Sequence, residues 1–98
     1  MTANLELNPL LSDRSRLLIM ALLAAAPAPV DFTTLCEELK MTKGNLSSHM
    51  RRLEESGMVR VEKAFVDRKP LTTYCCTKQG RTEVKSYLNQ VEKLLKQI

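Results

Sequence analysis

The chain has 98 residues, enough for one domain over residues 1–98, and its 44% hydrophobic and 27% charged residues are ordinary for a globular protein. Its longest uncharged apolar run, Leu17–Ala26, is too short to span a bilayer, and the opening MTANLELNPL lacks the basic and apolar regions of a signal peptide. These features argue against a membrane or secreted protein, so we expect a cytoplasmic one.

Positive charge gathers in the middle of the chain. Residues 1–39 hold two bases and five acids, residues 40–81 hold ten bases and four acids, and residues 82–98 hold three bases and two acids. A localised basic block indicates a polyanionic partner. Nucleic acid fits better than a membrane surface, because no basic amphipathic helix with aromatic anchors accompanies the block.

Helices are expected at the beginning of the chain. The Asn-Pro pair at residues 8–9 is typical of a helix start, so a short helix is expected there. A stronger helix is expected from about Ser12 or Asp13 to Ala25, where the sequence APAPV at residues 26–30 ends it.

A helix-turn-helix is expected over about residues 31–56. Asp31 is a candidate N-cap, and the apolar face of the first helix recurs at helical spacing in Phe32, Leu35, Cys36 and Leu39. This helix ends near Lys40, and a tight connection leads to the second helix.

Thr42 is the natural N-cap of the second helix, whose inward stripe consists of Leu46, Met50 and Leu53. Gly57 suits the position after the helix end, and Met58 can then pack back on Leu53 in a Schellman motif.

The outward face of this second helix is unusual for a helix surface. It carries a glycine, an asparagine and two serines, which are poor helix formers, together with basic residues: Lys43, Gly44, Asn45, Ser47, Ser48, Arg51 and Arg52. Small side chains at a helix N-terminus allow close approach to another surface, so we interpret this face as a contact surface.

A β-hairpin is expected at about residues 59–76. Its strands are Val59–Val66 and Leu71–Cys76, and the sequence DRKP at residues 67–70 forms the turn, with Arg68 and Lys69 at the tip.

Thr77 can cap a last helix over about residues 77–98. Seven apolar residues repeat there at helical spacing: Val84, Tyr87, Leu88, Val91, Leu94, Leu95 and Ile98. A small domain cannot easily cover so long a stripe, so a homodimer held by this helix is expected, with the N-terminal segment as a second contributor. The alternative is a helix that folds back wholly onto its own core.

The order of these elements is that of a winged helix-turn-helix, an α+β, mainly helical fold with a two-stranded wing and a C-terminal dimerisation helix. The stretch TTLCEELKMTKGNLSSHMRRLEESGMVRVEKAFVDRKPLTTYCCTKQGR resembles winged-helix transcriptional regulators of the MarR and ArsR type, above all small single-domain prokaryotic ones. The resemblance covers roughly Leu17 to Arg81. It departs from the pattern at the CC pair, where an ordinary strand residue is expected.

The resemblance implies a DNA-binding repressor or activator that acts as a homodimer. The residue pattern points the same way, with the second helix in the major groove and the wing tip on the backbone or minor groove of a pseudo-palindromic operator. The expected DNA-binding residues are Thr42, Lys43, Gly44, Asn45, Ser47, Ser48, Arg51, Arg52, Arg68 and Lys69.

Simpler interpretations stay open for several of these residues. Arg51 and Arg52 would also suit a solvated helix face, for example with Arg51 paired to Glu55. Arg68 and Lys69 would also suit a charged turn. His49, beside the apolar stripe, is expected to be a partly buried structural histidine, ahead of a DNA contact or a metal ligand.

The cysteines allow a sensing role as an alternative. Cys36 falls on a core face, while the adjacent Cys75 and Cys76 could bind soft metals or sense oxidation in a thiol- or metal-responsive regulator. Because no histidine or acidic cluster lies near them in the sequence, inert packing is favoured. The odd number of cysteines, without a CxxC pair, argues against a disulfide framework.

With one histidine, no glycine-rich phosphate loop and no nucleophile–base pairing, an enzyme is not expected, and neither is a metal or a cofactor. The sequence identifies no small-molecule effector. A winged-helix protein–protein module without DNA binding and an RNA-binding winged helix stay open, although the former usually lacks a basic face and the latter usually shows stacking aromatics.

Overall fold

The computed structural model describes residues 7–98, so expectations for residues 1–6, including part of the N-terminal segment, lie outside the described residues. Along the chain, the elements are α1 (Arg14–Ala25), β1 (Val30–Asp31), α2 (Phe32–Leu39), α3 (Lys43–Glu55), β2 (Val59–Val66), β3 (Lys69–Cys76) and α4 (Lys78–Leu95). Helices, a helix-turn-helix and a wing therefore follow in the expected order.

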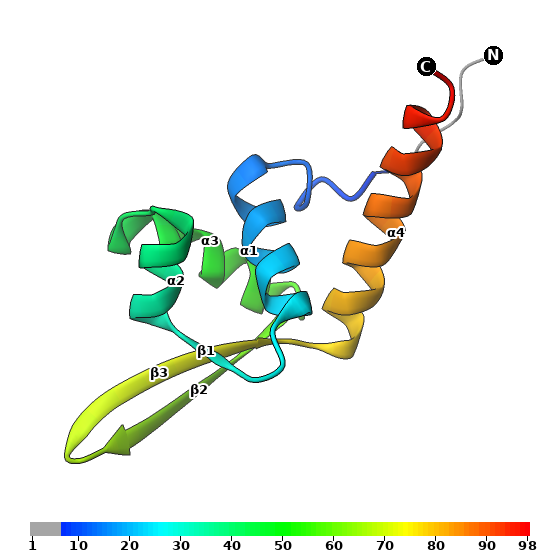
Figure 1. The fold of residues 1–98 in the computed structure, drawn as a ribbon. Coiled ribbons are helices and arrows are strands. Elements are labelled where there is room, and N and C mark those ends of the chain that lie inside the picture. Colours follow the sequence, from blue (N-terminus) through cyan, green and yellow to red (C-terminus); the bar gives the residue numbers. More distant parts are fainter. Residues whose placement is uncertain (1–6) are drawn as a thin grey trace.

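The molecule is elongated, because two elements project from the helical body. The β2–β3 hairpin extends from one end, and α4 extends from the other (Figure 1). The radius of gyration is 14.9 Å, above the value of about 13 Å typical of a compact chain of this length. None of the helices between residues 7 and 98 combines the length and the hydropathy that a membrane crossing requires.

Each α-helix begins at a side-chain cap. The expected caps Asp31, Thr42 and Thr77, and also Asp13, accept a hydrogen bond from the backbone N–H three residues further on. The hydrogen bond from the backbone of Arg16 holds the pKa of Asp13 below its usual value. The pKa of Asp31 is lowered first by the hydroxyl of Thr34 and then by its backbone N–H.

The short helix expected at residues 8–9 is wrong, because the chain forms only a turn there. The N–H of Leu11 donates to the carbonyl of Asn8 at 3.0 Å, and the Asn8 side chain accepts from the N–H of Leu10. Asp13 takes an extended backbone conformation in order to cap α1, and this stops the preceding turn from propagating.

The sheet has three strands in the order β1-β3-β2, one more than the sequence predicts. β3 pairs antiparallel with both neighbours, and the register places Val30 opposite Tyr74 and Val59 opposite Cys76. β1 has only two residues, which is too short for alternation to reveal a strand. It fastens the start of α2 to the base of the hairpin.

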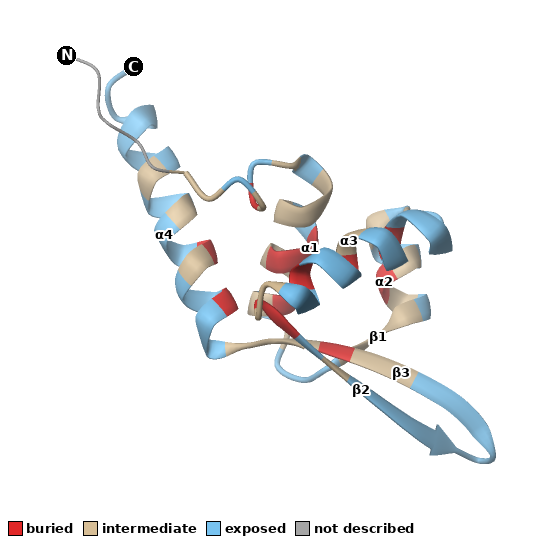
Figure 2. Ribbon diagram, turned by 180° about the vertical axis from the view of Figure 1, so that it is seen from behind, coloured by how far each residue is buried: buried red, intermediate tan, exposed pale blue. Residues whose placement is uncertain are grey.

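The core lies between α1, α2, α3 and the base of the hairpin, where the buried residues cluster (Figure 2). It includes the expected inward stripe of α3, Leu46, Met50 and Leu53. α1 contributes Ile19, Met20 and Leu23. The outer hairpin and the far end of α4 are exposed and take no part in it.

The end of α3 is the expected Schellman motif. Gly57 has a φ of 76°, its N–H donates to Glu54, and the N–H of Met58 donates to the carbonyl of Leu53 at 2.9 Å. Met58 is buried in the core, so the chain leaves α3 in a fixed direction into β2.

The start of α4 is bonded to this same point. The hydroxyl of Thr77 donates to the carbonyl of Gly57 at 2.6 Å, and its N–H donates to the carbonyl of Met58 at 3.1 Å. The Gln79 amide donates to the carbonyl of Ser56. Gly80 is buried, and a Cβ on it would lie 2.1 Å from the Met58 carbonyl oxygen. We call residues 56–58 and 77–80 the α3–α4 junction.

We expect Gly80→Ala to destabilise the fold, because an added methyl group meets backbone at the junction and overpacking typically costs about 1–3 kcal/mol or more. Urea unfolding measures the loss. Thr82→Ala, an exposed change on the same helix, is the control and should shift the transition far less. Equal stability of Gly80→Ala and the wild type would contradict the close approach.

Candidate nucleic-acid interface

The polar face of α3 is fully open to solvent. Thr42 and all seven polar or small residues expected on this face, from Lys43 to Arg52, are exposed, whereas Leu46, Met50 and Leu53 between them are buried. No ion pair joins Arg51 to Glu55 within the described chain, where the three salt bridges involve other residues. The basic side chains of α3 are therefore available to a partner, although Glu54 and Glu55 make its last turn acidic.

Gly44 has no role in packing. A Cβ built on it would meet no atom of residues 7–98 within 4 Å, and the residue lies in the first turn of an ordinary α-helix. Glycine weakens a helix relative to alanine, so the fold gains nothing from it. Packing within residues 7–98 therefore does not require a glycine at this position.

The tip of the hairpin is tighter than expected. The turn consists of Asp67 and Arg68 alone, both with positive φ (51° and 65°), while Lys69 and Pro70 belong to β3. A two-residue turn with this geometry matches the twist of the strands, and it usually contains Asn-Gly or Asp-Gly. The expected four-residue turn is wrong, because the ladder continues to the pair Val66–Lys69.

Arg68 occupies a strained position. A residue with a Cβ costs roughly 1–2 kcal/mol in the left-handed region relative to its preferred conformations, and glycine avoids this cost. Arg68 is exposed at the tip of the hairpin, and the exposed Lys69 follows it in the chain. The turn thus carries a cation where local stability favours glycine.

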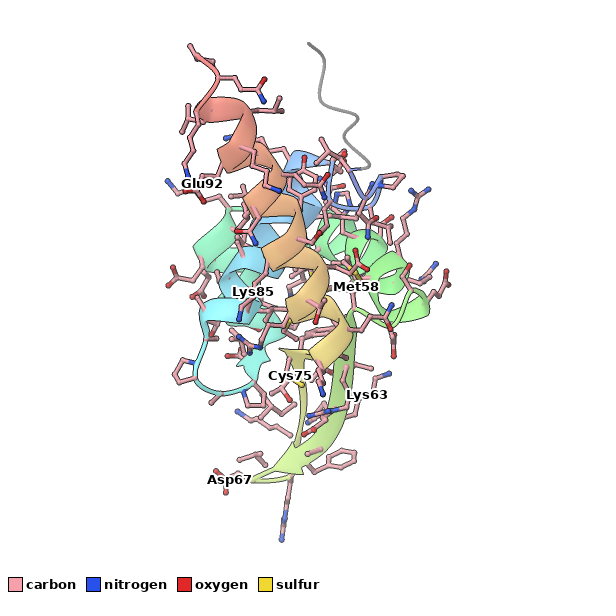
Figure 3. All side chains as sticks on the ribbon, turned by 90° about the vertical axis from the view of Figure 1, so that its right-hand side faces the viewer. Met58, Lys63, Asp67, Cys75, Lys85 and Glu92 are labelled. Carbon is pink, nitrogen blue, oxygen red and sulfur yellow. The ribbon has the colours of Figure 1, made fainter. Side chains whose placement is uncertain are left out.

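A groove separates α3 from the hairpin. Two adjoining hollows of about 400 and 270 Å³ share Ser47, Lys63 and Tyr74. Figure 3 shows Lys63 on the hairpin and Asp67 at its tip. Sequence reasoning did not place Lys63 in the interface, although the alternation that begins at Val59 puts it on the same strand face as Val61.

Tyr74 closes the inner end of the groove. It is almost fully buried, and its ring centroid lies 6.3 Å from that of Phe32. Burial, and secondarily the negative charge of Glu54, raise the pKa of its phenol. The phenol therefore stays neutral at physiological pH and acts as packing beneath the groove.

His49 is half-buried, as expected for a structural histidine. Nη1 of Arg16 lies 3.3 Å from its Nδ1, and Nε of Arg16 donates to the carbonyl of Leu10 at 2.7 Å. Because arginine is only a donor, Nδ1 accepts. The pair ties α3 to α1 and to the turn before it.

The apolar stripe of α4 is divided. Val84 is buried in its own domain, and Tyr87 is half-buried against that core, so only part of the Tyr87 side chain is open to a partner. The other five expected interface residues are 38–102% exposed: Leu88, Val91, Leu94, Leu95 and Ile98. The helix does not fold back wholly onto the domain, because residues 91–98 are all exposed. Near this stripe, Asn8 donates to Glu83, so this residue lies against α4.

The cysteines are half-buried free thiols. Cys36 and Cys76 pack against the core, and burial raises the pKa of Cys76 despite the opposing effect of Arg81. A raised pKa lowers the thiolate fraction and thus the reactivity. Cys75 lies next to it where β3 approaches α4 (Figure 3). Among residues 7–98, no three His, Cys, Asp or Glu side chains stand together as metal ligands.

Comparison with known proteins agrees with this architecture. Residues 15–95 match the family described as winged helix DNA-binding domain. An uncharacterised protein of Methanocaldococcus jannaschii is 35% identical over 68 residues, which make up 69% of this chain and 74% of that protein.

Solved structures give the same result. A transcriptional regulator homologue from Pyrococcus horikoshii OT3 superposes with a TM-score of 0.82 at 33% identity, covering 89% of this chain and 85% of that one. A zinc-responsive MarR family member of Lactococcus lactis superposes with a TM-score of 0.65 at 19% identity, covering 97% of this chain and 60% of that one. The latter likeness shows a shared fold.

Gly44 provides a test of the polar face that requires no partner. Gly44→Ala should stabilise the protein by about 0.4–1 kcal/mol, since the added methyl group meets open space and alanine restricts the unfolded chain. Urea unfolding measures the gain. Gly57→Ala is the contrasting control, because its φ of 76° strains any other residue and this change should destabilise the fold. A loss of stability in Gly44→Ala would show that the glycine serves the fold after all.

Proposed function

Because the chain belongs to the winged helix DNA-binding domain family, we propose that it is a transcriptional regulator that binds double-stranded DNA as a homodimer. In this proposal, α3 enters the major groove and the hairpin tip contacts the backbone or minor groove beside it. The two-fold axis of the dimer makes the operator a pseudo-palindrome.

The exposed first turn of α3 carries the proposal. Gly44 has no neighbour to accommodate, and Ser47 and Ser48 present only small side chains on the same face. Such a surface gives up helix propensity but lets the backbone come close to the floor of a groove. The charge agrees, because Lys43 at one end and the arginine pair further along frame this small polar face.

Each expected contact has a role that follows from its chemistry. Asn45 can bond the N6 and N7 positions of an adenine, whereas Arg51 and Arg52 suit guanine or phosphate. Thr42 accepts a hydrogen bond from the N–H of Asn45 as the N-cap, so it orders the first turn of α3, which presents Asn45. Arg68 and Lys69 suit phosphates or the minor groove next to the major groove that α3 enters.

The dimer is proposed from the uncovered end of α4. Five apolar side chains there, from Leu88 to Ile98, are more than a third exposed, and no element between residues 7 and 98 covers them. A second copy of α4 related by a two-fold axis would bury the same stripe on both sides. The two α3 helices would then lie about 34 Å apart, or a multiple of this distance, along the DNA.

A protein–protein module is the remaining alternative, and the exposed cations Lys43, Arg51 and Arg52 on α3 weigh against it. The alternative of a thiol-responsive regulator is less favoured, because Cys76 is half-buried and its raised pKa lowers the reactivity of the thiol. Neither alternative accounts for a glycine on an open helix face.

The proposal is tested by selecting bound duplexes from a randomised DNA library and titrating the selected site at several salt concentrations. We expect a two-fold symmetric site and an affinity that falls steeply with salt, by a log–log slope of about 0.9 for each phosphate contact. Gly44→Ala should bind this site more weakly although its fold is more stable. Selection of no sequence, together with salt-independent binding, would refute the proposal.

The dimer is tested with the double variant Val91→Glu/Leu95→Glu. It should sediment as a folded monomer and bind DNA much more weakly, because charges in the stripe prevent burial. The matched control is Asn89→Glu/Lys93→Gln, which changes the net charge equally on the opposite side of α4 and should stay dimeric. An unchanged mass and affinity in the first variant would rule out this interface.

A further inference from the structure

An exposed aromatic side chain stands near the tip of the hairpin. Phe65 is 79% exposed, and the register places the exposed Pro70 directly opposite it. The other phenylalanine of the chain, Phe32, packs against the core. Burying a phenylalanine contributes about 1.5–3 kcal/mol, so in the isolated domain Phe65 gives up a contribution that a partner can recover.

The strand face of Phe65 is the one that faces α3. Side chains alternate along a strand, so Val61, Lys63 and Phe65 share a face. Val61 and Lys63 line the groove together with Ser47 and Arg51 of α3. Pro70, the cross-strand partner of Phe65, lines the adjoining hollow with Ser47. The pair Phe65–Pro70 thus continues the groove beyond its outer end.

The hairpin around this apolar pair is rich in cations. Residues 63–70 hold Lys63, Arg68 and Lys69 against the single acid Asp67. An apolar side chain framed by positive charge matches a duplex, whose phosphates need cations and whose base steps offer flat apolar surfaces. An apolar protein surface would not require the cations.

From this placement we propose that Phe65, backed by Pro70, is an apolar wedge that inserts at a base step in the minor groove next to the half-site bound by α3. This inference rests on the proposed function and adds a source of specificity to it. Pyrimidine–purine steps such as TA and CA unstack most easily, so the wedge selects them without a hydrogen bond to any base.

The hairpin geometry supports such a role. The two-residue turn and the unbroken ladder from Val59–Cys76 to Val66–Lys69 hold the tip in one conformation. Pro70 has no N–H and a fixed φ, so it adds rigidity beneath the ring of Phe65 without leaving a donor unpaired. A rigid support reduces the conformational entropy lost on binding.

The test repeats the duplex selection with the wild type, Phe65→Ala and Val66→Ala. Val66 is 51% exposed on the opposite strand face, so it is a matched apolar control on the same strand. We expect the wild type and Val66→Ala to select a TA or CA step at a fixed distance from the bases read by α3. Phe65→Ala should retain those bases but lose the step.

Measurements of affinity and its salt dependence distinguish the contribution of Phe65 from that of the basic residues of the hairpin. Phe65→Ala should bind the selected duplex roughly tenfold more weakly with an unchanged salt slope, in line with the loss of one aromatic–base contact. Arg68→Ala should instead lower the log–log slope by about 0.9. A 2-aminopurine placed at the step should brighten when the wild type binds, and not when Phe65→Ala binds. Urea unfolding should be the same for the wild type and Phe65→Ala.

The outcomes are distinguishable. If Phe65→Ala selects the same sites as the wild type with the same affinity, the wedge is wrong while DNA binding stands. If the wild type selects no sequence, the proposed function itself fails. If Phe65→Ala lowers the sedimentation mass in the absence of DNA, Phe65 contacts another copy of the chain, and the wedge is overturned.

Discussion

The close approach of Gly80 to the Met58 carbonyl is the constraint on which the rest of the arrangement depends. It joins three elements at one point, because α3 ends, β2 begins and α4 starts there. The bonds from Thr77 to the carbonyls of Gly57 and Met58 close the same point. The direction of the hairpin and the direction of α4 are therefore both fixed relative to α3, and the two proposed functions of these elements, DNA contact and dimerisation, share one rigid connection.

Local chemistry made most of the fold predictable. The four caps and the Schellman glycine form hydrogen bonds with residues close to them in the sequence, so residue types and spacing alone predict these helix ends. The features that sequence reasoning missed depend on distant partners or on very short segments. β1 exists only because residue 30 meets Tyr74, and the turn at Asp67 is tight because the ladder continues to Lys69. The close contact at Gly80 likewise has no signal in the neighbouring sequence.

The candidate interface was predictable to the extent that composition and periodicity define an exposed face. All the expected residues of α3 and the hairpin tip are exposed, but only the spatial arrangement reveals that Ser47 and Lys63 line one groove. On this surface Gly44 in a helix and Arg68 in the left-handed region depart from local rules, as Lys40 also does where it ends α2. Natural sequences often depart from such rules at functional sites, so Gly44 and Arg68 support the proposed interface alongside its charge.

The rigid α3–α4 junction makes α4 a lever arm in the proposed dimer. From Gly80 to Val91 the helix rises roughly 16 Å, at 1.5 Å per residue. A change of about 10° in the crossing angle at the paired stripe would then shift one junction relative to the other by roughly 3 Å, close to the 3.4 Å rise between successive base pairs. Because α3 cannot yield independently, small repacking at the far end of α4 becomes a shift of register on the DNA. In the proposed dimer, residues that never touch the operator would thus govern the distance between half-sites.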